Sequence, residues 1–204
     1  DIYSRLIVGW EIHLHELAEH ASELVGKACL RQGIMREQLV LHSDNGSPMK
    51  GATMLAALQK LGVMPSFSRP SVSDDNPYSE SLFRTLKYTP AYPKKPFGHI
   101  DDARKWVHAF VTWYNTEHRH SGIQFVTPLQ RHTGEHHTVL EERKAVYAAA
   151  KQAHPVRWKG RETRNWTPTA IVWLNPDKEG DRPDQPVKLA AQNSGQPSRK
   201  TPHE

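Results

Sequence analysis

Two carboxylates, Asp44 and Glu80, carry the chemistry that this sequence indicates. Asp44 follows a short apolar run, and Glu80 stands near the start of a stretch with helical character. Thirty-five residues separate the two acids, so a carboxylate after a strand and a second one on a later helix can converge on one site. Hard oxygen ligands of this kind bind Mg²⁺, which supports phosphoryl transfer. The sequence therefore predicts a divalent-metal site.

Each of these residues also has an ordinary explanation. Asp-Asn-Gly at residues 44–46 is good turn chemistry, and Glu80 alone would be a solvated helical acid. Lys87 follows Glu80 by about two helical turns and shares its face. There it can hold a phosphate beside the metal, or it is simply a solvated lysine.

Four motifs in order give the sequence a family resemblance. They are LHSDNGS at 41–47, ESLFRTLK at 80–87, WYN at 113–115 with RHS at 119–121, and TP at 127–128. In this order and spacing, residues 1 to about 134 resemble the integrase core of bacterial insertion-sequence transposases. These belong to the DDE type shared with retroviral integrases.

The resemblance implies an enzyme that cleaves and joins DNA ends by metal-dependent phosphoryl transfer. Two Mg²⁺ or Mn²⁺ ions are expected in the complete enzyme, which acts as a homo-oligomer on element ends and target DNA. Asn45 to Ser47 would shape the loop beside the site, and Tyr78 and Arg84 would either touch DNA or serve packing. The residues implied are Asp44 and Glu80 for catalysis and metal binding, and Lys87, Asn45, Tyr78 and Arg84 for DNA binding.

The family's first catalytic Asp has no clear counterpart. It lies upstream of the second acid on the first strand, and Asp1 is the only acid near the start. We interpret Asp1 as a turn residue, because residues 1–5 resemble the turn after the family's second strand, and we expect an N-terminally truncated chain. A catalytically inactive remnant with weak DNA binding is therefore the alternative to an active transposase. A host nuclease with the same core is disfavoured by the motifs at 113–128.

Composition limits the remaining possibilities. The chain has 204 residues and a formal net charge of +5, and no apolar run approaches the length of a membrane span. One cysteine, Cys29, excludes an internal disulfide and fits a reducing cytoplasm, where a bacterial transposase would be nucleoid-associated. Cys29 itself is interpreted as a small buried apolar residue in a helix.

Periodicity predicts alternating strands and helices, and the resemblance implies an α/β fold of the RNase H-like integrase type that here lacks its first strands. Such a core leaves backbone groups unpaired, so we expect the chain to be aggregation-prone or partly unfolded. Gly62 closes the second helix, a loop spans 68–75, and Asn76 and Pro77 begin the third helix. The expected strands are 6–13, 39–42 and 63–67, and the expected helices are 16–32, one from about 48 to 61, 77–88 and 100–118.

The C-terminal part is expected to differ from the core. We divide the chain into a partial catalytic core at 1–134, a helix at 139–153 with a possible small β module within 135–174, and a disordered tail at 175–204. Trp158, Trp166 and Trp173 alternate with basic residues, which fits either nucleic-acid binding or a small structural core. Trp106, Phe110 and Trp113 have helix-core spacing. The histidines at 118–120 and 132–137 lack zinc-site spacing, so they are interpreted as structural.

Overall fold

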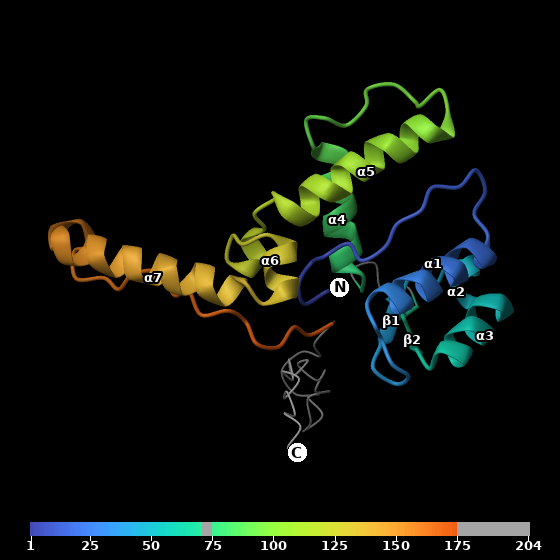
Figure 1. Cartoon of the computed structure of the whole chain (residues 1–204), viewed down its shortest axis with the longest axis horizontal. Helices are drawn as coiled ribbons and strands as arrows, with labels where there is room; N and C mark the ends of the chain where they lie inside the picture. Colours follow the sequence, from blue (N-terminus) through green and yellow to red (C-terminus); the bar gives the residue numbers. More distant parts are fainter. Residues whose placement is uncertain (71–74, 175–204) are drawn as a thin grey trace, which may run out of the picture.

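The computed structural model describes residues 1–70 and 75–174 of the chain (Figure 1). The predicted tail at 175–204 and part of the predicted loop at 68–75 lie outside the described residues. The elements are α1 (Ala18–Arg31), β1 (Val40–Ser43), α2 (Ser47–Lys50), α3 (Ala52–Leu61), β2 (Met64–Phe67), α4 (Pro77–Tyr88), α5 (Ile100–Thr116), α6 (Pro128–Thr133) and α7 (His136–Ala153), with 3-10 turns η1 (Ser121–Ile123) and η2 (Pro155–Trp158).

The sheet among the described residues consists of two parallel strands. β1 pairs with β2 in a register that places Val40 opposite Met64 and Ser43 opposite Phe67. The core beside this sheet comprises Cys29 of α1, Met54 and Leu58 of α3, and Val63, which leads into β2. Cys29 is 5% exposed, which confirms its interpretation as a small buried residue, and burial raises the pKa of its thiol.

The helix expected before the second strand is divided in two. Gly51 has an extended backbone (φ −62°, ψ 149°), so α2 ends there and α3 begins. Gly62 closes α3 with a left-handed φ of 68°, as predicted. A Cβ at Gly62 would lie 2.8 Å from the Cβ of Arg36, so both the backbone and the close approach require glycine.

The expected strand at 6–13 is not formed. The segment is extended but pairs with no strand among the described residues, and an asparagine side chain supplies its partner instead. Asn115 of α5 accepts a hydrogen bond from the Ile7 N–H at 3.0 Å and donates one to the Ile7 carbonyl at 3.1 Å. The guanidinium of Arg104 donates to the Ile12 carbonyl at 3.1 Å. The strand prediction for this segment was therefore wrong, because its backbone groups find side-chain partners instead of a neighbouring strand.

A second core lies between α6, α7 and the residues that follow α7. It contains Ile123, Val126, Leu140 and Trp166. Thr127 caps α6 through a reciprocal capping box with Gln130, and Pro128 takes the first turn. This explains the Thr-Pro pair of the sequence as a helix start.

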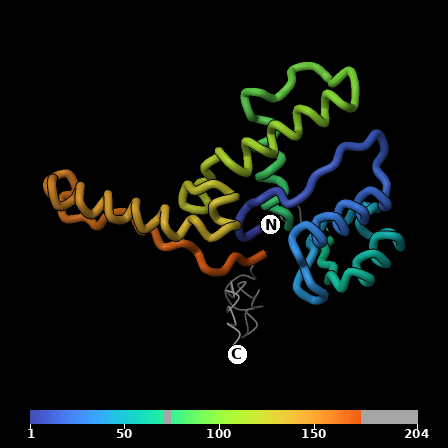
Figure 2. Tube along the Cα trace, in the orientation of Figure 1, coloured from blue at the N-terminus to red at the C-terminus, as the bar shows by residue number. Residues whose placement is uncertain are grey.

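Arg131 joins three parts of the chain. It is 2% exposed and donates from α6 to the Tyr3 carbonyl at 2.8 Å and the Thr169 carbonyl at 2.7 Å. Its guanidinium also lies 4.3 Å from the centre of the Tyr3 ring. Figure 2 shows the N-terminal segment starting near the middle of the molecule, beside the α6 region.

The expected β module is wrong. After α7 and η2, residues 159–174 run back along α7 without forming a strand (Figure 1). Trp166 is buried in the second core and makes an edge contact with Tyr147 of α7, their ring centres 5.2 Å apart. Of the two readings left open for the tryptophans, the structural one holds for Trp166. The alternation reflects an extended segment that packs against a helix.

The expected helical packing of Trp106, Phe110 and Trp113 is confirmed. Phe110 is 5% exposed, and the Trp106 ring stacks on it at 5.7 Å between centres. Within the described residues, no helix is both long enough and apolar enough to cross a membrane.

The Asn115 contact generates a stability prediction. Asn115→Ala should lower the free energy of unfolding by about 1–3 kcal/mol, because both Ile7 backbone groups lose their partner. Urea unfolding followed by circular dichroism measures this loss. Thr112→Ala removes a hydroxyl that bonds only to its own helix, so it should cost less. Equal effects of the two substitutions would contradict the assigned role of Asn115.

Candidate functional site

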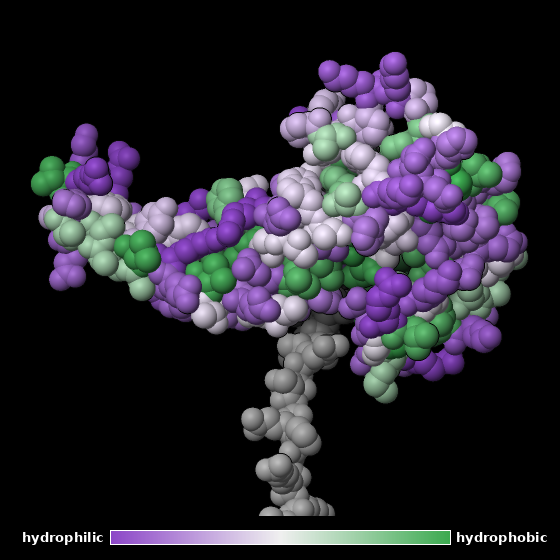
Figure 3. All heavy atoms as spheres, turned by 45° about the horizontal axis from the view of Figure 1, so that its top comes forward, coloured by the Kyte–Doolittle hydropathy of each residue, from purple (hydrophilic) through white to green (hydrophobic). Residues whose placement is uncertain are grey.

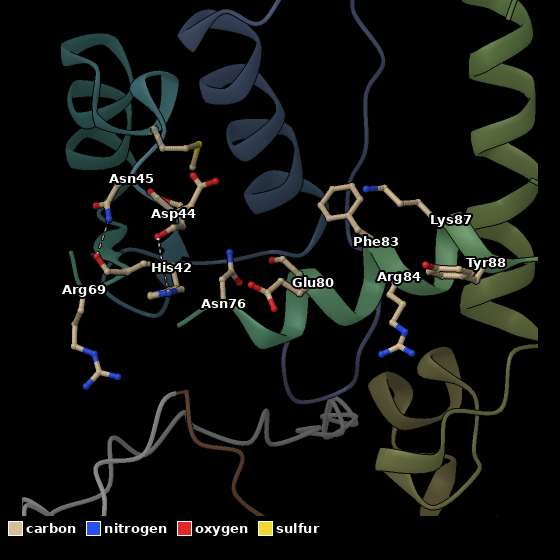
Figure 4. Close-up of a pocket in the computed structure, with 14 residues that line it drawn as sticks. His42, Asp44, Asn45, Arg69, Asn76, Glu80, Phe83, Arg84, Lys87 and Tyr88 are labelled. Carbon is tan, nitrogen blue, oxygen red and sulfur yellow. Dashed lines mark hydrogen bonds between the residues drawn. The ribbon is translucent and has the colours of Figure 1, made fainter. Parts of the chain in front are cut away.

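An open pocket of about 980 Å³ lies where β1 and β2 end and α4 begins. Both strands are parallel, so their carboxyl ends meet at one edge, where ligand sites of α/β sheets commonly form. Figure 4 shows the arrangement of its side chains. The lining residues are His42, Ser43, Asp44, Asn45, Met49, Ser68, Arg69, Asn76, Ser79, Glu80, Phe83, Arg84, Lys87 and Tyr88.

Asp44 is held in the turn that follows β1. One carboxylate oxygen, Oδ1, accepts a hydrogen bond from the Gly46 N–H at 3.1 Å, while the other accepts none from the described residues. A Cβ at Gly46 would lie 3.1 Å from Asp44 Oδ1. The turn interpretation and the ligand interpretation are therefore compatible, because the turn orients the carboxylate and leaves one oxygen available.

Asn45 connects the two loops at the strand ends. Its side-chain amide donates to the Ser68 carbonyl at 3.0 Å, so it holds the loop after β1 against the residue that follows β2. This agrees with the expectation that residues 45–47 shape the loop beside the site.

His42 fixes the start of α4 against the sheet. From β1, its Nδ1 lies 3.0 Å from the Ser66 hydroxyl of β2, and its Nε2 lies 3.2 Å from the Asp75 carbonyl. A carbonyl can only accept, so Nε2 carries the hydrogen, and the Ser66 hydroxyl donates to Nδ1 when the ring is neutral. One imidazole thus connects both strands to the residue just before the α4 cap.

Asp75 adds a second attachment at the same place. Its carboxylate is 3% exposed and accepts from the Arg69 backbone N–H at 2.6 Å and from the Arg69 guanidinium at 2.6 Å. These hydrogen bonds lower the pKa of Asp75 to about 2. The start of α4 is thereby held to the end of β2.

α4 presents an acid, two cations and two aromatic rings to the pocket. Glu80 stands in its first turn and Lys87 in its last, where each charge is favourable to the helix dipole. In Figure 4, Glu80 lies on the side of α4 nearest Asn76 and Asp44, and Lys87 and Arg84 lie further along the helix. Phe83 is 56% exposed although it lines the pocket.

The structure brings five of the six predicted site residues together. Tyr78 is the exception, because it does not line the pocket. Its hydroxyl donates to the Trp173 carbonyl at 2.8 Å, and the Arg5 guanidinium lies 4.1 Å from its ring centre. Asn76 occupies the N-cap position as expected, but its side chain makes no capping hydrogen bond and faces the pocket instead.

Asp1 does not join the two acids. Its carboxylate accepts hydrogen bonds from the backbone N–H groups of Tyr3 and Ser4, and it contacts the Ser4 hydroxyl and His132. This is the predicted turn role. Among the described residues, no group of three or more histidine, cysteine or acidic side chains is placed to hold a metal ion.

Comparisons with known proteins relate most of the chain to one family. Two family models, both described as integrase core domain, match residues 1–73 and 61–128. The first match includes Asp44, and the second includes Glu80. Residues 1–128 belong to the integrase core family. The predicted relation to the integrase cores of insertion-sequence transposases is confirmed. The helices and the small parallel sheet agree with the predicted α/β class.

The curated relatives of this integrase core are transposases. The transposase for insertion sequence element IS904 of Lactococcus lactis is 28% identical over 63% of this chain and 50% of its own length. A probable transposase for insertion sequence element IS1353 of Shigella flexneri is 29% identical over 56% of this chain and 22% of its own length. The chain thus spans at most half the length of these two relatives.

The solved structure of the catalytic core domain of BIV integrase is similar to this chain. It is 21% identical, covers 67% of this chain and 84% of its own length, and gives a TM-score of 0.44. Because the TM-score is below 0.5, the family assignment depends on the sequence matches.

Sequence reasoning missed the positioning residues of the integrase core. His42 stands two residues before Asp44 within the LHSDNGS motif, so its place in the motif was the available signal. Asp75 stood in a segment that was predicted only as loop. The exposure of Phe83 and Tyr88 at the pocket had no signal, because aromatic residues in an amphipathic helix usually face the core.

The His42 bridge generates a local prediction. His42→Ala should release the start of α4, so the amides of its first two turns should exchange hydrogen about tenfold faster or more, consistent with the loss of about 1–3 kcal/mol. Hydrogen exchange with mass spectrometry measures this. His108→Ala, an exposed position on α5, is the control. Unchanged protection of α4 in His42→Ala would contradict the bridging role.

Proposed function

We propose that the integrase core takes part in DNA transposition by metal-dependent phosphoryl transfer that cleaves and joins DNA ends. The observation that carries the proposal is the convergence of Asp44, from the end of β1, and Glu80, from the first turn of α4, on one open pocket lined by cations. The relatives named as transposases support it. The activity of the whole protein is part of this proposal.

The donor groups in the pocket fit Mg²⁺ or Mn²⁺. Asp44 keeps one carboxylate oxygen available, and Glu80 is exposed toward the same space. Carboxylate oxygens are the ligands that hard divalent cations prefer. Asp44 and Glu80 would hold the metal, and two ions are proposed for the complete enzyme. A bound ion would supply activation of the attacking oxygen and stabilisation of the leaving oxygen.

The cations beside the acids suit a DNA phosphate. Lys87 and Arg84 lie on α4 along the pocket from Glu80, and both are exposed. We assign them to the phosphates next to the reacting bond, where charge-assisted hydrogen bonds orient the strand. The exposed ring of Phe83 offers a stacking surface for a base.

The two other predicted DNA contacts, Asn45 and Tyr78, differ in their position relative to the pocket. Asn45 is fixed at the pocket through Ser68 and keeps its amide oxygen for a DNA donor group. Tyr78 faces Trp173 and Arg5, so a DNA contact there would require approach from outside the pocket. Action as a homo-oligomer on DNA in the bacterial cytoplasm completes the proposal.

A catalytically inactive protein that binds DNA weakly is the second candidate. The observation that favours it is the absence of a third acid beside Asp44 and Glu80 among the described residues. Under this reading the pocket would bind DNA through Lys87 and Arg84 without reaction.

Joining of DNA ends distinguishes the two candidates. With Mg²⁺ or Mn²⁺ and labelled element-end DNA, the wild-type chain should give joined products, and Glu80→Gln should reduce them at least about 100-fold, because a metal ligand is lost. Glu141→Gln, an exposed acid of α7, is the matched control and should keep activity. Wild-type product at the level of Glu80→Gln would reject the enzyme reading for this chain and favour the inactive one.

The Asp44 turn generates a separate prediction on metal affinity. Gly46→Ala should weaken Mn²⁺ binding about tenfold, because its Cβ would press on Asp44 Oδ1. Gly51→Ala is the control, since Gly51 has nearly the same backbone angles (φ −62°, ψ 149° against φ −59°, ψ 143°) and its Cβ would meet no atom closer than 3.4 Å. Titration with Mn²⁺ monitored by electron paramagnetic resonance measures both. Equal affinities of the two variants would contradict Asp44 as a ligand.

A further inference from the structure

The arm, defined as residues 136–170, extends away from the rest of the molecule. It consists of α7, η2 and the segment that returns along α7, and its far end is turned away from the α4 pocket (Figure 1). It lies beyond residue 128, where the family matches end. Nothing in the pocket chemistry accounts for it.

Most of the net charge of the chain is concentrated at the end of this arm. The tip, defined as residues 151–164, contains five basic residues and one acid, a net charge of +4, whereas the whole chain has +5. Figure 3 shows hydrophilic side chains at the visible end of the arm, interspersed with hydrophobic ones. The basic residues are Lys151, Arg157, Lys159, Arg161 and Arg164.

Two of these five cations have partners within the arm or its base. Lys151 pairs with Glu162 at 3.0 Å, and the Arg164 guanidinium lies 4.8 Å and 5.0 Å from the ring centres of Phe125 and Trp166. Among the described residues, the remaining three form no ion pair and are exposed. They are Arg157, Lys159 and Arg161.

The backbone of the tip gathers these three cations at a tight reversal. Lys159 and Gly160 have left-handed φ angles of 45° and 77°, and the Arg161 N–H donates to the Trp158 carbonyl at 2.8 Å. A left-handed conformation costs a non-glycine residue roughly 1–2 kcal/mol. A lysine therefore stands at a strained position and presents its charge at the outermost turn.

The tip is fixed to the helix rather than loosely attached. The Lys151–Glu162 ion pair closes the return segment onto the end of α7, and Trp166 packs against Tyr147 and Leu140 further back. Cations on a backbone that is already held in place lose less backbone freedom on binding than cations on a flexible chain.

We propose that the tip is a second DNA-binding site, which contacts the phosphate backbone of duplex DNA without reading its sequence. Three unpaired cations within five residues match a polyanion with closely spaced charges. An anionic membrane surface is the weaker match, because Val156 is the large apolar residue exposed at the tip, and membrane binding needs an apolar face. The site requires neither Asp44 nor Glu80, so DNA binding by the tip can be tested independently of the proposed catalytic function.

The salt dependence of DNA binding tests the proposal. The test variant carries Arg157→Gln, Lys159→Gln and Arg161→Gln. The matched control carries Arg31→Gln, Lys60→Gln and Lys105→Gln, which removes the same charge from exposed positions on α1, α3 and α5. Fluorescence anisotropy with a labelled duplex of unrelated sequence, without divalent metal, gives the dissociation constant across a range of NaCl concentrations.

The tip variant should bind more weakly, and its slope of log affinity against log salt should become shallower by roughly 2–3, at about 0.9 per lost phosphate contact. The control should change the slope by less than about 1, and Asp44→Asn should leave the contribution of the tip intact. Circular dichroism establishes that each variant is folded. The proposal is overturned if the wild type does not bind duplex DNA, if both triple variants shift equally, or if the tip substitutions reduce binding to phosphatidylserine vesicles and not to DNA.

Discussion

The hydrogen bonds of the His42 imidazole connect the two parts of the chain that form this site. Asp44 and Glu80 belong to separate elements, and the sheet that carries Asp44 has two short strands among the described residues. His42 joins β1 to Ser66 of β2 and to the Asp75 carbonyl, and the buried Asp75 carboxylate joins the same point to Arg69. Because α4 begins immediately after Asp75, these contacts fix the position of Glu80 relative to Asp44. A metal or phosphate site needs such a supporting layer, since small displacements of ligands are costly.

Side chains also hydrogen-bond to the backbone of distant segments outside the pocket. The extended segment near the start of the chain is paired by the amide of Asn115 rather than by a strand. Arg131 is buried and pairs with no carboxylate among the described residues. It donates hydrogen bonds to carbonyl groups of two distant segments. Each contact replaces a backbone partner with a side chain, and each lies in or beside the motifs at 113–128. Residues in and beside those motifs therefore hold distant segments of the fold together.

Helices and strands that depend on local sequence pattern could be predicted from the sequence. Contacts that depend on residues far away in the sequence could not. Apolar periodicity placed α1, β1, β2, α4, α5 and α7 within a few residues, and motif spacing placed Asp44 and Glu80 in one pocket. The segment at 6–13 was expected to pair as a strand, because its local apolar composition cannot reveal that the Asn115 side chain is the partner. The tryptophans of the arm suggested a β module because an extended segment packed on a helix also alternates. Tyr78 was assigned to the site from its motif, whereas Trp173, 95 residues further along, engages its hydroxyl.

The central proposal is that Asp44 and Glu80 belong to one divalent-metal site. The most direct measurement is Mn²⁺ affinity by electron paramagnetic resonance for the wild type, Asp44→Asn, Glu80→Gln and the double variant, since a double-mutant cycle isolates the coupling between two groups. Each single substitution should weaken Mn²⁺ binding about tenfold or more. The double variant should bind no more weakly than the weaker of the single variants, within about twofold. Full independence of the two substitutions, or Mn²⁺ binding that neither one changes, would contradict this proposal.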